Sequence, residues 1–233
     1  MTYKAVRNKN MKRTKLRDRI LPAYTKGEEI FNMVSHIVGG AFGIIALVSC
    51  VLVAALRHNA WGVVSSAIYG ASLVILYTMS SVYHGLRKNM GKLVMQILDH
   101  CMIYLLIAGT YTPILLVSIR PVSPGWAWSI FGIVWGLAVL GAVFTAIDLK
   151  KYSVFSMICY IGMGWCIIVA AKTVVEAMQF AGLMWLLAGG IAYTVGAVLY
   201  GLGRKHKYMH SIFHMFVVLG SILHYIAILL YVL

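Results

Sequence analysis

Long apolar runs, separated by short polar breaks, follow one another along nearly the whole chain. Each run holds about 20 residues, enough for a helix to cross roughly 30 Å of hydrocarbon. Barrel strands would alternate polar and apolar positions over about ten residues, and these runs do not alternate. The pattern predicts an all-α fold, a polytopic bundle of seven transmembrane helices. The predicted spans are residues 31–56, 61–83, 94–118, 124–147, 153–172, 179–203 and 209–232.

Composition supports a membrane protein. Of the 233 residues, 61% are hydrophobic and only 11% are charged, and a soluble domain of this composition would expose too much apolar surface. No internal repeat or low-complexity segment is evident. We therefore expect one membrane domain, residues 28–233, preceded by a basic tail, residues 1–27.

The distribution of basic residues predicts the orientation of the bundle. With the N-terminus inside the cell, 17 of the 20 Lys and Arg residues lie in the tail and the inner loops, as the positive-inside rule requires. The N-terminus is thus predicted to be cytoplasmic and the C-terminus outside, as in a resident multi-pass protein of the plasma membrane. The formal charge of +14 then reflects topology and does not indicate a nucleic-acid partner. The tail is either solvated or rests on anionic headgroups. Nothing in the sequence indicates an oligomeric state.

Ionisable residues from three spans are predicted to share one depth. His84 ends the second span, Asp99 lies in the first two turns of the third, and His210 and His214 lie in the first two turns of the seventh. At 1.5 Å per residue, all four fall within about 10 Å of depth near the inner leaflet. Ionisable groups inside a membrane are costly, so each is a candidate for function.

This layer has the chemistry of a metal site. His210 and His214, four residues apart, point the same way on a helix, and His84 from another span can complete a three-histidine set. Three nitrogen ligands with an open fourth position are typical of catalytic zinc, whose bound water has a pKa of about 7. Ser80 lies four residues before His84 on the same face, and Asp99 can accept a hydrogen bond from the metal-bound water or from a ligand imidazole. The alternative is that these histidines simply face water at the interface.

Five further polar residues lie outside this set. Glu29, Asn32 and His36 share one face of the first span. For them we favour capping and packing, with a place beside the inner-leaflet layer as the alternative. His224, deeper in the seventh span, either lines a cavity or hydrogen-bonds a neighbouring helix. Asp148 is interpreted as an ordinary loop charge.

Four stretches resemble the motifs of haemolysin III–related proteins, which belong with the progestin and adipoQ receptors and, more distantly, the alkaline ceramidases. The stretches are "EEIFNMVSHIVGG", "SSVYHGL", "LDHCMIYLLIAGTYTP" and "HSIFHMFVVLGSILHY". The resemblance covers residues 28 to 233. It implies a seven-helix bundle with a cytoplasmic N-terminus and a zinc ion held by His84, His210 and His214. It also implies that Asp99 lies near the zinc through water.

The resemblance leaves three hypotheses for function. The superfamily suggests a zinc-dependent hydrolase of a lipid amide such as ceramide, in which Asp99 takes the proton of the attacking water and Ser80 stabilises the oxyanion. The second hypothesis is a non-catalytic membrane-homeostasis or receptor-like protein with structural zinc. The third is a membrane-lytic haemolysin. An open fourth metal position facing a lipid-sized cavity would favour the first, and a fourth protein ligand the second.

Overall fold

The computed structural model describes residues 13–203 and 206–233, and this part of the chain is helical and contains no strand. Seven helical segments are long and apolar enough to cross a membrane, which confirms the predicted fold class. The basic residues before Arg13, and the pair Arg204 and Lys205, lie outside the described residues. The elements are η1 (Leu16–Asp18), α1 (Lys26–Leu56), α2 (Ala60–Gly85), α3 (Met90–Pro113), η2 (Ile114–Ile119), α4 (Arg120–Val122), α5 (Pro124–Asp148), α6 (Ser153–Trp165), η3 (Cys166–Ala170), α7 (Ala171–Ala177), α8 (Phe180–Leu202) and α9 (Met209–Tyr231).

Polar caps set where the inner helices begin. Thr25 and Glu28 form a capping box at the start of α1, and the side chain of Asn89 accepts a hydrogen bond from the Lys92 amide at the start of α3. Such caps satisfy amides that have no partner within the helix. Both helices therefore begin about one turn before the predicted spans. The caps stabilise a first helical turn that is polar, whereas the predicted spans followed the apolar residues alone.

The third span changes geometry at Pro113. The α-helix ends there and continues as the π-helix η2, since proline lacks the amide proton that the preceding turn requires. Thr110 and Thr112 donate hydrogen bonds to the carbonyls of Leu106 and Ala108. Pro113 thus marks a local change of helix type within one continuous span.

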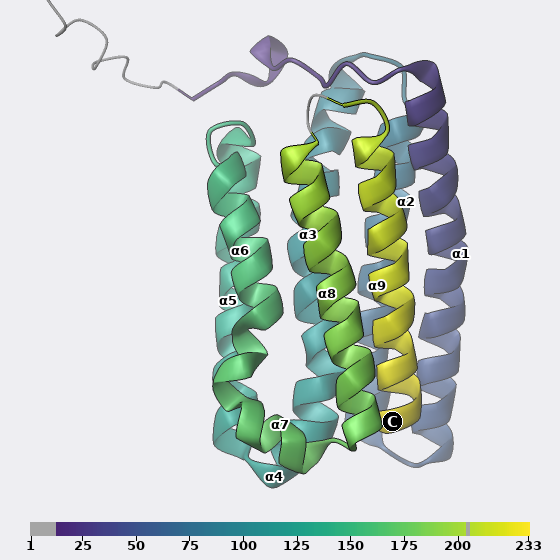
Figure 1. The fold of residues 1–233 in the computed structure, drawn as a ribbon, viewed down its shortest axis with the longest axis vertical. Helices are drawn as coiled ribbons and strands as arrows, with labels where there is room; N and C mark the ends of the chain where they lie inside the picture. Colours follow the sequence, from purple (N-terminus) through teal and green to yellow (C-terminus); the bar gives the residue numbers. More distant parts are fainter. Residues whose placement is uncertain (1–12, 204–205) are drawn as a thin grey trace, which may run out of the picture.

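The helices stand side by side along the long axis of the molecule (Figure 1). Among the seven spans, the one that contains α3 is the most buried, and α3 packs against α2, α5 and α6. The outer faces of the other helices expose large apolar side chains, among them Ile37, Ile45 and Leu52 of α1. Such a surface suits acyl chains as its surroundings.

Two glycines allow close helix contacts. A Cβ atom on Gly39 would lie 2.6 Å from the ring of Tyr77, and one on Gly189 would overlap the ring of His224. Their neighbours Gly40 and Gly190 have ordinary room for a side chain, with the nearest atoms 3.7 Å away. Only the first glycine of each adjacent pair is therefore required by packing.

The segment of residues 13–25 runs across the end of the bundle where α1, α3 and α9 begin (Figure 1). The Thr14 amide donates to the Asp148 carboxylate at 2.8 Å, and the Arg19 guanidinium donates to the Ile147 carbonyl at 3.0 Å. Asp148 is buried. The interpretation of Asp148 as an ordinary loop charge is therefore wrong, because it fastens the N-terminal segment to the end of α5.

Candidate metal centre

Three histidines from two helices meet at this end of the bundle. The Nε2 atom of His210 lies 3.3 Å from that of His84 and 3.1 Å from that of His214. All three side chains are buried, and their ligand atoms lie within 4.8 Å of one another. Within the described part of the chain, this is the one group of three or more residues with metal-ligand geometry. The spacing of His210 and His214 and the common membrane depth predicted for His84 thus correspond to close contact in space.

Hydrogen bonds to the outer ring nitrogens indicate which tautomers are present. His84 Nδ1 lies 2.7 Å from Glu29 Oε2. An ionised carboxylate only accepts hydrogen bonds, so the proton of a neutral His84 sits on Nδ1 and Nε2 carries a lone pair. His214 Nδ1 lies 3.5 Å from Ser35 Oγ, and that hydroxyl donates its own proton to the Asn32 carbonyl. His214 Nε2 therefore also carries a lone pair.

This arrangement fits a divalent cation. The lone pairs of His84 and His214 both face His210 Nε2, and a neutral His210 has only one proton to offer. His210 Nδ1 is buried without a hydrogen-bond partner among the described residues. No hydrogen bond therefore favours the tautomer of His210 that carries its proton on Nδ1. One proton cannot satisfy two converging lone pairs, whereas a cation among three nitrogens can. Three imidazole ligands suit zinc better than calcium or magnesium, which take oxygen ligands.

Glu29 supports the site from α1. Its second carboxylate oxygen accepts a hydrogen bond from Lys92 Nζ at 2.7 Å, and Lys92 also donates to the Leu86 carbonyl. A carboxylate that fixes the ring of a ligand histidine is the usual outer shell of a zinc site. The residue in contact with a ligand imidazole is therefore Glu29, not Asp99.

Asn32 and His36 also border the cluster. Asn32 accepts a hydrogen bond from the Ser211 hydroxyl at 2.7 Å, and the ring of His36 stacks on that of His214 with centroids 3.6 Å apart. Of the favoured role in capping and packing, the capping part is wrong, since Glu28 forms the cap, whereas Asn32 and His36 do pack against α9. In the sequence, the position of the three residues on one helix face indicated the alternative, a place beside the histidine cluster.

Ser80 and Asp99 lie beside the histidines on one cavity. Both residues line it together with His210 and His214. Ser80 Oγ is buried and has no hydrogen-bond partner among the described residues. Asp99 Oδ2 lies 3.7 Å from His100 Nδ1 and is outside the group with ligand geometry. Their predicted positions next to the cluster are therefore compatible with roles toward a molecule in the cavity.

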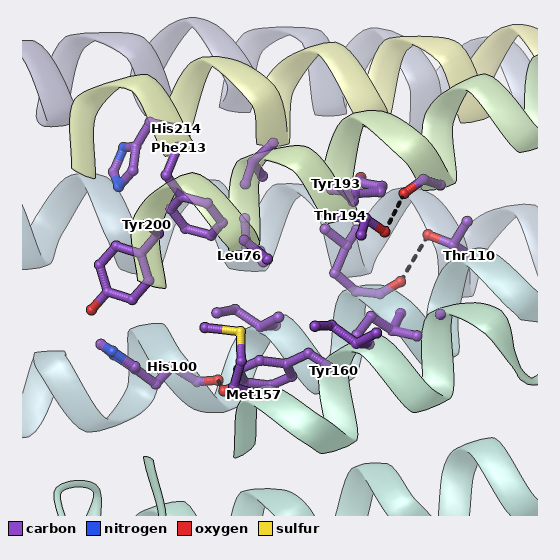
Figure 2. A pocket seen from close by; sticks show the side chains of 18 of the residues that line it. Leu76, His100, Thr110, Met157, Tyr160, Tyr193, Thr194, Tyr200, Phe213 and His214 are labelled. Atoms are coloured by element: carbon purple, nitrogen blue, oxygen red, sulfur yellow. Dashed lines mark hydrogen bonds between the residues drawn. The ribbon is translucent and has the colours of Figure 1, made fainter. Parts of the chain in front are cut away.

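The cavity has a volume of about 160 Å³ and runs along the bundle between α3, α6, α8 and α9. Figure 2 shows His214, Tyr200 and His100 at one end and Tyr193, Thr194 and Thr110 at the other. Between them the walls are apolar and include Leu76, Ile103 and Val217. The space therefore suits an apolar chain whose polar group lies at the histidines.

Tyr24 of the N-terminal segment covers the cluster from the end of the bundle where α1 and α9 begin. Its ring stacks on that of His210, with centroids 5.1 Å apart and planes 10° apart. Burial raises the pKa of the Tyr24 phenol well above its ordinary value of 10, so the ring stays neutral at physiological pH. Tyr24 thus shields the histidines without adding charge to the site.

Glu29→Gln is expected to weaken metal binding about tenfold. The amide still fills the space but no longer supplies a negative charge to His84, and loss of such outer partners costs roughly 10–100-fold in metal affinity. Competition with a chelating dye measures this on the purified protein. Glu28→Gln is the matched control, because Glu28 caps α1 and accepts from the Tyr208 amide. Equal zinc affinity in the two variants would contradict the role of Glu29.

The fold and the site define a class of protein: a seven-helix membrane protein with three buried histidines at one end of an apolar cavity. The sequence profile of Haemolysin-III related proteins matches residues 24–225, and the chain belongs to this family. It is 40% identical over 207 residues to Hemolysin-3 of Bacillus cereus, covering 88% of this chain and 92% of the relative. It is 38% identical to the Hemolysin-3 homolog of Bacillus subtilis (strain 168), covering 89% and 96%.

A more distant similarity extends to animals. The chain is 29% identical over 191 residues to the human monocyte to macrophage differentiation factor, covering 78% of this chain and 76% of that protein. The family resemblance drawn from the four sequence motifs is thereby confirmed.

Proposed function

We propose that this protein is a zinc-dependent hydrolase of a lipid amide in the plasma membrane. The observation that carries the proposal is the group of three histidine nitrogens at one end of a cavity with apolar walls. No fourth His, Cys, Asp or Glu joins the group within the described residues. A bound zinc ion therefore keeps a coordination position for water or substrate, as catalytic zinc sites do.

Zinc bound here would supply a water that is nucleophilic near neutral pH and would polarise the amide carbonyl. The surrounding residues have separate roles. Asp99 accepts the proton of the attacking water and returns it to the leaving amine nitrogen as the C–N bond breaks, so that the products are a carboxylic acid and an amine. The Ser80 hydroxyl donates a hydrogen bond to the carbonyl oxygen as it becomes negative. The apolar walls hold the acyl chain.

A structural role for zinc is the second candidate. His84 belongs to α2, the other two histidines belong to α9, and Glu29 connects α1 to the same point. A metal ion at this position would clamp three helices together without any turnover. Membrane lysis, which the name of the Bacillus cereus relative suggests for that protein, finds no comparable support in a bundle of seven ordinary spans.

Metal removal separates the two candidates. The protein, reconstituted in nanodiscs, is given a panel of ceramides and N-acyl amino acids, and fatty acid release is measured by mass spectrometry. For a hydrolase we expect release from at least one amide, its loss after chelation, and its return with one equivalent of zinc. Release that persists after complete chelation would contradict the zinc mechanism. Stoichiometric zinc without release from any amide would favour the structural role.

A further inference from the structure

A second cavity lies between the N-terminal segment and the helix ends, and we call it the end chamber. Its volume is about 710 Å³, within the range of roughly 300–1,000 Å³ that is usual for small-molecule sites. Residues 18–25 line one side of it. The other sides are formed by the end of α5, the start of α6, the end of α8 and the start of α9.

The end chamber and the apolar cavity adjoin at the metal cluster. Five residues line both spaces: His100, Met157, Tyr160, Tyr200 and His210. The ring of Tyr200 lies against that of His210, with centroids 5.3 Å apart. An amide whose carbonyl lies at the three histidines can therefore place its acyl chain in the apolar cavity and its amine portion in the end chamber.

The two spaces differ in charge. Among the described residues that line the apolar cavity there is no Lys or Arg, whereas Arg19, Lys150 and Lys207 line the end chamber. Asp148 offsets the charge of Arg19. Lys150 and Lys207 are exposed, and neither forms an ion pair with a carboxylate in the described part of the chain. Their flexible ammonium groups are thus available to an anionic ligand.

The two carboxylates that line the end chamber already have partners. Glu28 accepts hydrogen bonds within the α1 cap and from the Tyr208 amide, and it attracts Lys207. Asp18 is exposed and lies 3.8 Å from the Arg17 guanidinium. Lys150 is therefore the cation of the lining whose charge is least offset, and an anion in the chamber would meet a net positive field.

We propose that the end chamber binds an acidic amine portion, so that the substrates are N-acyl amino acids and similar lipid amides with an anion on the amine side. Lys150 and Lys207 select this charge. The inference rests on the proposed function in placing the amide carbonyl at the three histidines. Selection of the charge is a binding property and does not require hydrolysis. A ceramide, by contrast, has a second long chain and no charge on its amine side.

The test compares three amides that share one acyl chain and differ in charge. At neutral pH, N-palmitoylglycine is anionic, N-palmitoylethanolamine is neutral and N-(2-aminoethyl)palmitamide is cationic. Their binding to the zinc-loaded protein in phosphatidylcholine nanodiscs is measured by displacement of a fluorescent N-acylethanolamine, and empty nanodiscs correct for partition into lipid. We expect affinity to fall about fivefold at each step from anion to neutral amide to cation, the scale of one exposed charge pair.

Two lysine variants assign the preference to the chamber. The double variant Lys150→Gln/Lys207→Gln should bind the three amides with nearly equal affinity. Lys151→Gln is the matched control, because it removes a charge from the same loop. Lys151 Nζ lies over the Tyr152 ring, and Lys151 is outside the residues that line the chamber. This variant should therefore keep the preference.

Two results would overturn the inference: equal affinity of the wild-type protein for the three amides, or an unchanged preference in the double variant. The second result would assign the preference to direct contact of the carboxylate with zinc. Fatty acid release, followed by mass spectrometry in the same samples, tests the proposed function separately. Charge preference without release would support the binding site and contradict hydrolysis, whereas release without charge preference would support hydrolysis and contradict the inference.

Discussion

Replacing His210 with alanine is expected to remove stoichiometric zinc and to lower the thermal stability of the protein. His210 Nε2 is within 3.3 Å of both other ligand nitrogens, and the two remaining imidazoles form a poor site on their own. At a zinc concentration one hundred times Kd, a bound ion stabilises the folded state by about 2.7 kcal/mol. For a protein of this size, that loss lowers Tm by roughly 5–10 °C.

Elemental analysis and a thermal scan of the purified variant, with and without added zinc, measure both effects. His58→Asn is the matched control, because His58 lies in the loop between α1 and α2 and has a φ of 53°, a conformation that asparagine tolerates. It should keep its zinc and its response to zinc. A His210→Ala protein with undiminished zinc would refute the three-histidine site.

Replacing Asp99 with asparagine is expected to abolish amide hydrolysis while zinc stays bound. The amide has nearly the same shape but cannot take a proton from water, and loss of a positioned base costs about 10²–10⁴-fold in rate. Asp99 is not among the residues with metal-ligand geometry, so metal content should not change. Turnover of the active amide and zinc content are measured on the same preparation.

The control for this variant is Glu176→Gln, the same chemical change on α7 at the opposite end of the bundle (Figure 1). Its turnover should equal that of the wild-type protein. Normal turnover in Asp99→Asn would remove Asp99 as the base. Loss of zinc in that variant would instead assign Asp99 a direct part in metal binding.

Hydropathy and helix geometry were sufficient to predict the seven spans and the meeting of His84 with His210 and His214. The first follows from the length of hydrocarbon to be crossed, and the second from depth and an i, i+4 spacing. Both depend on one coordinate, the position along the membrane normal. Sequence patterns report this coordinate well, because charged and apolar residues partition along it.

The rotation of each helix about its own axis was much harder to predict. Whether Glu29 faces α2 or lipid depends on packing contacts such as that of Gly39 with Tyr77, which no periodicity in one helix reveals. For the same reason the contact of Glu29 with a ligand imidazole was not predicted, and that contact was considered for Asp99 as one of two alternatives. The fastening of residues 13–25 by Asp148 was missed because it joins a polar segment to a distant helix end.

The first turn of α1 has a consequence for how the protein is made. Adjacent carboxylates there reach the end of α2, the start of α3 and the start of α9, through His84, Lys92 and the Tyr208 amide. During synthesis α1 emerges first and α9 last, and His84 and His210 are 126 residues apart. A metal ion at this site would therefore meet all three histidines only after the seventh span has entered the bilayer, so we expect metal loading to be a late step of membrane biogenesis.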